Sequence, residues 1–242
     1  MLSNILICNN CAAENPLFYL NCKKCNAILR NRIVNIDLWN CLRKLIDEPS
    51  NAFLMIIQSE NKNYISILLS LFSVRILLYV KMLSVYSNHV KVLHISDFII
   101  SVIIILTLVF LFSIILKLLF KFMRIETRIK DIFSLLGYST FPLILSLIIL
   151  FPLELSVFGE YLFQISPGPF EIKASLAYTF LIIEILLLIW HLILSTKALN
   201  IITNKKLISI LGSVVFLFTS YFLMSIFFIL NSWSIIFNGI KN

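Results

Sequence analysis

Long apolar runs with few charges constrain this chain more than any other feature. Five stretches rich in Ile, Leu, Val and Phe occupy residues 64–85, 97–119, 138–158, 174–195 and 207–230. A helix that crosses the hydrocarbon core of a bilayer needs about 20 apolar residues. Because apolar residues make up 60% of the chain and charged residues only 13%, a single soluble globule would have too little polar surface to cover its core. The sequence therefore predicts an all-α polytopic membrane protein with five transmembrane helices.

The distribution of basic residues predicts the orientation of these spans. One side holds most of the Lys and Arg residues, namely Lys23, Lys24, Arg30, Arg32, Arg43, Lys44, Lys62, Lys117, Lys121, Arg124, Arg128, Lys130, Lys197, Lys205 and Lys206. The opposite side holds Lys81, Lys91, Lys173 and Lys241. The positive-inside rule then places the N-terminus in the cytoplasm and the C-terminus outside. We expect an integral protein of the plasma membrane.

The same argument limits the partners that the net charge of +8 implies. Basic loops that set topology and touch anionic headgroups account for the charge, so we expect the lipid bilayer as a partner and no nucleic acid. No span has the Gly-x-x-x-Gly spacing of a close dimer seam, and a homo-oligomer stays open. The N-terminus lacks the basic and apolar regions of a signal peptide, so we expect the N-terminal domain to stay on the side where it is synthesised.

Four cysteines in residues 1–31 predict a zinc-ribbon-like knob. Cys8 and Cys11 form one Cys-x-x-Cys pair and Cys22 and Cys25 form a second, with a ten-residue loop between the pairs. This spacing suits four thiolates around one structural zinc ion. A segment this short cannot bury a sufficient core, so the metal would supply most of its folding free energy. An iron centre and a thiol redox site remain as alternatives.

Two smaller expectations accompany the knob. The residue after the second cysteine of each pair often has a positive φ, which Asn26 tolerates and Ala12 tolerates poorly. The fifth cysteine, Cys41, lies outside the pairs and is expected to pack as a small hydrophobic residue.

Residues 32–62 predict an amphipathic linker at the membrane interface. Helical spacing places apolar side chains on one face, namely Leu38, Trp39, Leu42, Leu45 and Ile46. A helix with such a face and adjacent cations can lie in the headgroup plane, or it can equally well pack on a protein partner or on the spans themselves. A second short piece, 51–58, leads to the first span. We expect the membrane domain over 63–235 and a short tail over 236–242.

Two charges and a histidine lie inside predicted spans. Arg75 is near the middle of the first span and Glu184 near the middle of the fourth, with His191 seven residues later on the same helical face. An unpaired charge at the bilayer centre costs about 3 kcal/mol, which favours pairing between Arg75 and Glu184. A structural ion pair, a transport site and incidental placement all remain open.

A short motif before the third span resembles the Yip-domain (Ypt/Rab-interacting protein) family. The motif comprises Gly137, Tyr138, Ser139 and Pro142, and the resemblance covers about 50–235 with five spans and a cytoplasmic N-terminus. Gly137 and Pro142 are expected to flank the point where the chain enters lipid, with Tyr138 at the interface. The resemblance implies an adaptor role, which in eukaryotic relatives serves vesicle trafficking. The N-terminal knob, together with the lack of the eukaryotic Asp-Leu-Tyr-Gly-Pro segment, suggests a prokaryotic member.

No catalytic constellation stands out in the chain. It has no Gly-rich phosphate loop, no His-Glu-x-x-His helix and no nucleophile motif, so we expect a protein that is not an enzyme. The leading hypothesis is an integral membrane scaffold or adaptor whose zinc knob recruits a cytoplasmic protein partner or contacts the membrane surface. The alternatives are a small transporter or permease subunit that uses Arg75 and Glu184, and a membrane enzyme that uses the cysteines for redox chemistry.

Overall fold

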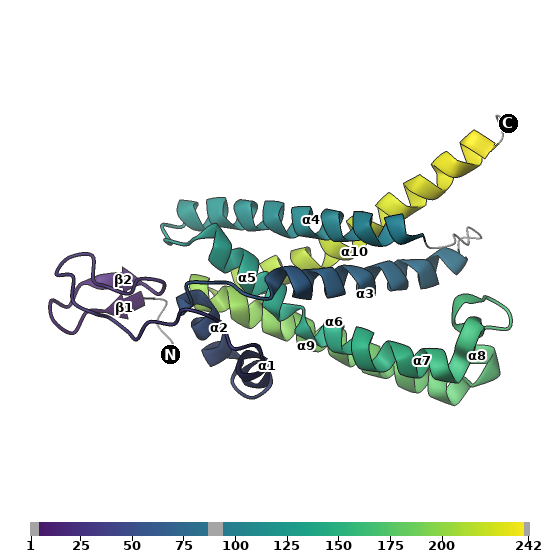
Figure 1. Ribbon diagram of the computed structural model, residues 1–242, viewed down its shortest axis with the longest axis horizontal. Helices are drawn as coiled ribbons and strands as arrows, with labels where there is room; N and C mark the ends of the chain where they lie inside the picture. The colour runs from purple at the N-terminus through teal and green to yellow at the C-terminus, as the bar shows by residue number, and fades with distance from the viewer. Residues whose placement is uncertain (1–4, 87–93, 240–242) are drawn as a thin grey trace. The chain divides into compact units, whose positions relative to one another are not determined.

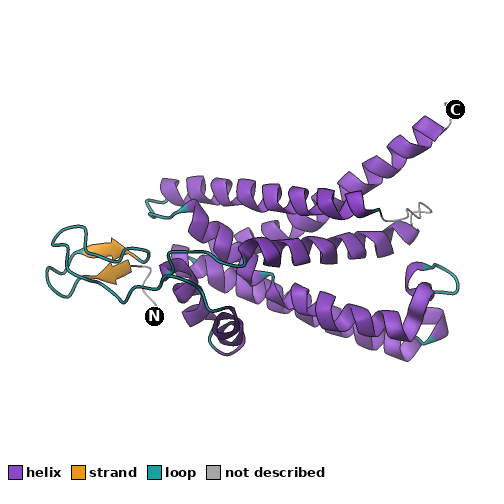
Figure 2. Ribbon diagram, viewed as in Figure 1, coloured by secondary structure: helices purple, strands orange, loops and turns teal. Residues whose placement is uncertain are grey.

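The computed structural model describes residues 5–86 and 94–239, and these are predominantly helical (Figures 1 and 2). Five helical segments in the described part of the chain are long and apolar enough to cross a membrane: Ile65–Leu83, Ile95–Phe122, Ile129–Phe163, Ala174–Thr203 and Lys206–Phe228. The predicted five-span architecture is therefore confirmed. Lys91 and Lys241, which entered the prediction of topology, lie outside the described residues.

The N-terminal knob is built on two short strands. β1 (Ile5–Ile7) pairs antiparallel with β2 (Glu14–Pro16), so that Ile5 lies opposite Pro16. A second, isolated antiparallel bridge joins Asn21 to Ile28. Each pairing closes the chain around one pair of cysteines, which gives the knob its zinc-ribbon-like form (Figure 2).

The linker contains two helices, α1 (Leu38–Asp47) and α2 (Pro49–Gln58). Asp37 caps α1 by accepting a hydrogen bond from the Asn40 amide at 3.2 Å, and Pro49 suits the first turn of α2 because its missing donor would have no partner there. Cys41 and the apolar Leu45 are fully buried, so the expectation for Cys41 holds.

The apolar side chains of α1 do not share one environment, which corrects the prediction of a single face. Leu45 is buried in the protein, whereas Trp39 is 81% exposed and Ile46 is 56% exposed. Helices α1 and α2 pack against each other. This packing takes up one side of α1 and leaves Trp39 and Ile46 on its outer surface.

The spans have different regularity. The first, second, fourth and fifth consist of the uninterrupted helices α3 (Ile65–Tyr86), α4 (Ile95–Phe122), α9 (Ala174–Thr203) and α10 (Lys206–Gly239). The third is segmented into α5 (Ile129–Ser139), α6 (Phe141–Leu145), the π-helix η1 (Ser146–Leu150), α7 (Phe151–Phe158) and the 3₁₀ helix η2 (Gly159–Phe163). The short α8 (Pro169–Ile172) precedes α9.

Two predicted boundaries change. The third span begins at Ile129 rather than at 138, because the charged residues in its first turns have partners in the protein. Helix α10 continues to Gly239 and so includes the first part of the predicted 236–242 tail, whose last residues, 240–242, lie outside the description.

The chain divides into two compact units. The first comprises Met1–Leu68, Val109–Phe141 and Leu192–Val215, and the second comprises Leu69–Leu108, Pro142–His191 and Phe216–Asn242. In the first unit, α9 and α10 approach closely at Gly212, where an added Cβ would lie 2.9 Å from Leu199 Cδ1. Beside it, Thr196 Oγ1 donates to Ser213 Oγ at 3.1 Å. Each unit has its own buried polar cluster.

Candidate functional site

The four cysteines sit on two knuckles of nearly identical geometry. In the first, the Ala12 amide donates to the Cys8 carbonyl at 2.9 Å, and in the second the Asn26 amide donates to the Cys22 carbonyl at 3.0 Å. Ala12 has φ 53° and Asn26 has φ 60°, so both turns use the expected left-handed residue. Ala12 pays the steric cost of this conformation, since only the absence of a Cβ removes it fully.

The sulfur atoms converge as a tetrahedral metal site requires. All four Sγ atoms lie within 4.8 Å of one another, with 3.5 Å between Cys8 and Cys25 and 3.6 Å between Cys11 and Cys22. Four sulfurs at about 2.3 Å from a zinc ion would stand about 3.8 Å apart, whereas a disulfide needs about 2.05 Å. The cluster can hold one metal ion, and its four sulfurs suit either zinc or iron.

A buried asparagine that the sequence reasoning missed ties the knuckles together. Asn15 is 1% exposed, and its Nδ2 donates to the Ala13 carbonyl at 2.9 Å and to Cys22 Sγ at 3.5 Å. Its Oδ1 accepts from the Lys23 amide at 2.9 Å. The signal in the sequence is the Asn-Pro step, Asn15-Pro16, between the cysteine pairs.

Backbone amides also favour the charged form of the thiols. Hydrogen bonds from the Cys25 and Lys24 amides, together with a smaller effect of the Asn15 side chain, lower the pKa of Cys22 to about 6. An amide from Ala27 lowers the pKa of Cys25 in the same way. A thiolate is the form that binds a metal, so the fold prepares this pair as ligands.

We expect Asn15→Ala to raise the dissociation constant for zinc about 10- to 100-fold, the usual effect of removing a residue that orients metal ligands. The substitution removes the donor to Cys22 Sγ and the link between the knuckles while keeping all four thiols. Competition with a chromophoric chelator measures the constant. Asn21→Ala is the matched control, because the Asn21 amide donates to Asn26 Oδ1 at an exposed position. Equal affinities for the two variants would contradict the role of Asn15.

The knob contacts the loop between α4 and α5. Lys23 Nζ lies 2.6 Å from Glu126 Oε2, and the Arg128 guanidinium stacks over the Phe18 ring at 4.4 Å from its centroid. Arg30 holds the segment around Phe18 by donating to the carbonyls of Phe18 and Tyr19, both at 3.2 Å. The cysteine domain and the loop before the third span therefore meet within one compact unit.

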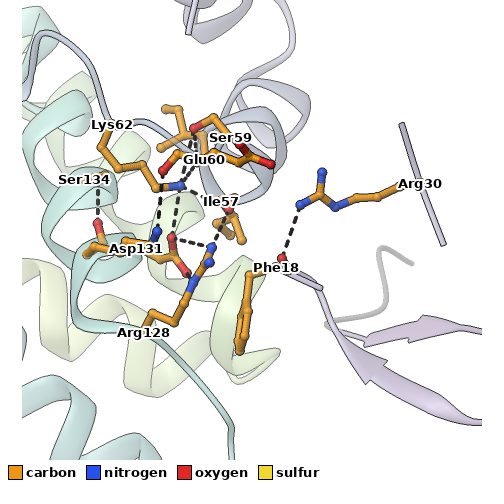
Figure 3. A network of polar contacts seen from close by, with 11 residues as sticks. Phe18, Arg30, Ile57, Ser59, Glu60, Lys62, Arg128, Asp131 and Ser134 are labelled. Atoms are coloured by element: carbon orange, nitrogen blue, oxygen red, sulfur yellow. Dashed lines mark hydrogen bonds and ion pairs between the residues drawn. The ribbon is translucent and has the colours of Figure 1, made fainter. Parts of the chain in front are cut away.

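Two cations converge on Asp131, as Figure 3 shows. Arg128 binds both carboxylate oxygens, at 2.7 and 3.1 Å, and Lys62 Nζ lies 3.0 Å from Oδ1. Lys62 also donates to the Ile56 and Ile57 carbonyls, and Arg128 donates to Ile57 at 3.1 Å. The two cations thus cap the C-terminus of α2, where carbonyl groups lack helical partners. From the sequence, Lys62 and Arg128 were expected only to set the topology of the spans.

We expect a pH dependence of stability that Lys62 causes. Burial lowers the pKa of Lys62 from 10.5 to about 8, against the raising effect of the Asp131 carboxylate. In the unfolded chain Lys62 stays protonated up to a pH near 10.5, whereas in the folded protein it loses its proton above about pH 8. Unfolding between these two pH values therefore binds a proton. The contribution of Lys62 to the free energy of unfolding should therefore rise with pH across this window, by about 3 kcal/mol. Unfolding titrations of the wild type and Lys62→Met measure it, and parallel pH profiles for the two chains would refute it.

The family motif lies inside the third span rather than at its start. Tyr138 is fully buried, and its hydroxyl donates to the Asn63 carbonyl at 2.5 Å. Ser139 and Thr140 donate to the carbonyls of Leu136 and Gly137 at 2.7 Å. Tyr138 is therefore enclosed by protein, and the motif joins the start of the first span to the third. Pro142 follows the break between α5 and α6.

The second unit contains an ion pair between two spans. Arg75 Nη2 pairs with Glu184 Oε1, and Ser146 Oγ, at the start of the π-helix η1, donates to the same oxygen at 2.6 Å. Arg75 is 3% exposed. Ser146 in η1 thus adds a contact from the third span to the Arg75–Glu184 pair. Single π-helical turns within α-helices occur often at functional sites.

Two further polar residues lie in this unit. Glu154 is buried, and its Oε2 has no hydrogen-bond partner among the described residues. His191 is fully buried between aromatic rings, with centroid distances of 6.3 Å to Phe72 and 6.0 Å to Phe216. His191 therefore lies next to the aromatic rings of Phe72 and Phe216, whereas the Glu184 carboxylate contacts Arg75 and Ser146.

Comparison with known proteins gives one finding. The sequence model of the Yip1 domain matches residues 43–236, which includes α2, all five spans and the Tyr138 motif, and leaves out the cysteine knob. No curated protein and no solved structure matches the chain. The match therefore covers the membrane domain and says nothing of what the knob does.

Proposed function

The chain belongs to the Yip1 domain family of membrane proteins, and from that premise we propose that it acts as an integral membrane scaffold whose knob recruits a protein partner. The docking of the knob carries this proposal. Contacts of Lys23 with Glu126 and of Arg128 with Phe18 hold the knob on the membrane domain, while Ile28, 79% exposed, and Ile7 stay on its surface. A small domain that contacts the membrane domain and exposes apolar side chains suits protein recognition.

The outer surface of α1 supplies the contact with the membrane surface in this proposal. Trp39, Arg43 and Ile46 follow one another at helical spacing, and all three are exposed. An indole next to a cation is the combination that binds the headgroup region. In this proposal the metal of the knob is a structural zinc ion. Because zinc would occupy all four thiols, the cysteines would not catalyse redox chemistry, and the protein in this proposal is not an enzyme.

The proposal places the knob in the cytoplasm and the C-terminus outside the plasma membrane. The excess of Lys and Arg on the side of the knob supports this orientation. An odd number of spans, five, puts the two termini on opposite sides of the bilayer. The proposed partner is accordingly a cytoplasmic protein.

Photo-crosslinking in native membranes tests the proposal. We expect a diazirine amino acid at position 28 of the full chain to give protein adducts, and the same probe at position 39 to give lipid adducts. The protein adducts should disappear in the Cys8→Ser/Cys11→Ser chain, whose knob cannot hold its metal. Lipid adducts at both positions would instead show that the knob contacts the membrane and recruits nothing.

A permease subunit is the second candidate, and one observation favours it. The second unit holds two charged groups with buried atoms that lack hydrogen-bond partners among the described residues, Arg75 Nη1 and Glu154 Oε2. Ionisable groups inside a membrane commonly mark a path for solutes or protons. This function predicts that Arg75→Met/Glu184→Leu folds but abolishes solute flux in proteoliposomes, whereas a scaffold keeps its crosslinks at position 28.

A further inference from the structure

A cavity of about 460 Å³ lies where α4 ends, in the first compact unit. Its wall comes from the last turns of α4, from the loop that follows and from Phe18 of the knob. The volume is in the range of about 300–1,000 Å³ that small-molecule sites occupy. Neither the metal cluster nor the Arg75 pair contributes to it.

The wall of this cavity is strongly basic. Lys117 and Lys121 lie one helical turn apart on the same face of α4, and Arg124 follows in the loop. None of the three forms an ion pair within the part of the chain that the structure describes. The one carboxylate in the wall, Glu126, is already neutralised by Lys23 at 2.6 Å. Three uncompensated cations therefore face one hollow.

A hydroxyl group adds a directional donor. Thr127 lines the cavity, and its buried Oγ1 has no hydrogen-bond partner among the described residues. A buried hydroxyl without a partner costs free energy that a bound acceptor would recover. Three cations and a hydroxyl donor suit the oxygens of a phosphate group.

The surroundings of the cavity distinguish a lipid phosphate from a soluble one. Leu118, Leu119 and Phe122 alternate with the cations along the same turns of α4 and are exposed, Phe122 by 90%. In a membrane-crossing helix such side chains meet acyl chains. The cations that would contact the phosphate oxygens and the apolar side chains that would contact the acyl chains thus lie within one helical turn of each other on α4.

We propose that this cavity binds the phosphate headgroup of an anionic phospholipid. The headgroup lies between Lys117, Lys121 and Arg124, with Thr127 donating to a phosphate oxygen and Phe18 closing the side toward the knob. The acyl chains run along the exposed apolar side chains of α4. The site requires only that the chain is embedded in a bilayer, so it stands or falls independently of the proposed recruitment of a partner.

The test uses the full chain in nanodiscs made from equal parts of phosphatidylcholine and phosphatidylglycerol. Native mass spectrometry after mild release into detergent measures which lipid is retained. We expect the wild type to retain phosphatidylglycerol, and Lys117→Gln/Lys121→Gln to lose affinity for it about tenfold or more. Lys205→Gln/Lys206→Gln is the matched control, because it removes the same charge from exposed positions of the same unit. An equal loss in both variants, or none in either, would overturn the site.

A third variant, a check of folding and a competition experiment complete the test. Arg124→Gln, at an exposed position outside the helix, should weaken retention without affecting the fold, and unchanged thermal unfolding of each variant verifies that it is folded. Glycerol phosphate in the buffer should not displace the lipid at millimolar concentration. If it displaces the lipid fully, the site binds free phosphate and the assignment to a lipid is wrong.

Discussion

Arg75→Met should lower the free energy of unfolding by about 3–5 kcal/mol, the usual cost of removing one partner from a buried ion pair. Methionine replaces the arginine with an unbranched apolar side chain, so that the Glu184 carboxylate is left without its cation. Glu184 would then keep only Ser146, which donates to the same oxygen that Arg75 binds. Unfolding by denaturant in nanodiscs, followed by circular dichroism, measures the change.

The double variant gives the sharper result. Arg75→Met/Glu184→Leu removes both charges and replaces them with apolar groups, so most of the lost stability should return. The matched control is Lys81→Met on the same helix, where the cation is partly exposed and lies over the Phe163 ring at 4.6 Å. We expect that change to cost about 1 kcal/mol or less. A double variant as unstable as Arg75→Met alone would mean that the pair does more than balance charge.

Removal of two thiolates should abolish metal binding and unfold the knob. Wild-type protein should contain about one zinc ion per chain, and Cys8→Ser/Cys11→Ser about none, because two sulfur ligands cannot complete a tetrahedral site. In its described residues the knob is built on two three-residue strands and one isolated bridge, so limited proteolysis of the variant without metal should cut within residues 1–31. The spans should stay protected, since their cores are separate from the cysteines.

Cys41→Ser is the control for this experiment. Cys41 is fully buried in α1 and does not belong to the cluster, so its loss should leave the metal content unchanged. Elemental analysis identifies the metal, and an iron centre would also absorb visible light. Wild-type protein without metal and with four reactive thiols would contradict the structural role and support redox chemistry instead.

The unequal success of prediction along the third span has a clear physical cause. Hydropathy placed its start at 138 because Arg128, Lys130 and Asp131 are poor residues for lipid. In the structure Asp131 is held by Arg128 and Lys62, so the helix begins at Ile129 within the protein. Tyr138 likewise has a polar partner within the protein, because its hydroxyl donates a hydrogen bond to the Asn63 carbonyl.

The helical period of α1 predicts an apolar face but leaves open whether lipid or protein covers it. Spacing correctly marked Leu45 and Trp39 as apolar positions of a helix. Only the packing of α2 against one side of α1 decides that Leu45 is buried and Trp39 exposed. Local patterns fix which side chains are apolar and leave open what covers them.

The sequence by itself determined the five spans, the cluster of four cysteines that could hold a metal and the left-handed residues Ala12 and Asn26. These depend on local quantities, namely the number of apolar residues needed to cross lipid, the reach of a two-residue spacer and the conformation that one residue adopts. Only the tertiary structure decided how Lys62 reaches Asp131, how Phe18 and Lys121 come to line one cavity, and where Asn15 binds. The contact of Lys62 with Asp131 and the cavity shared by Phe18 and Lys121 join segments that lie tens of residues apart. No local pattern encodes which of many polar groups a buried polar side chain will contact.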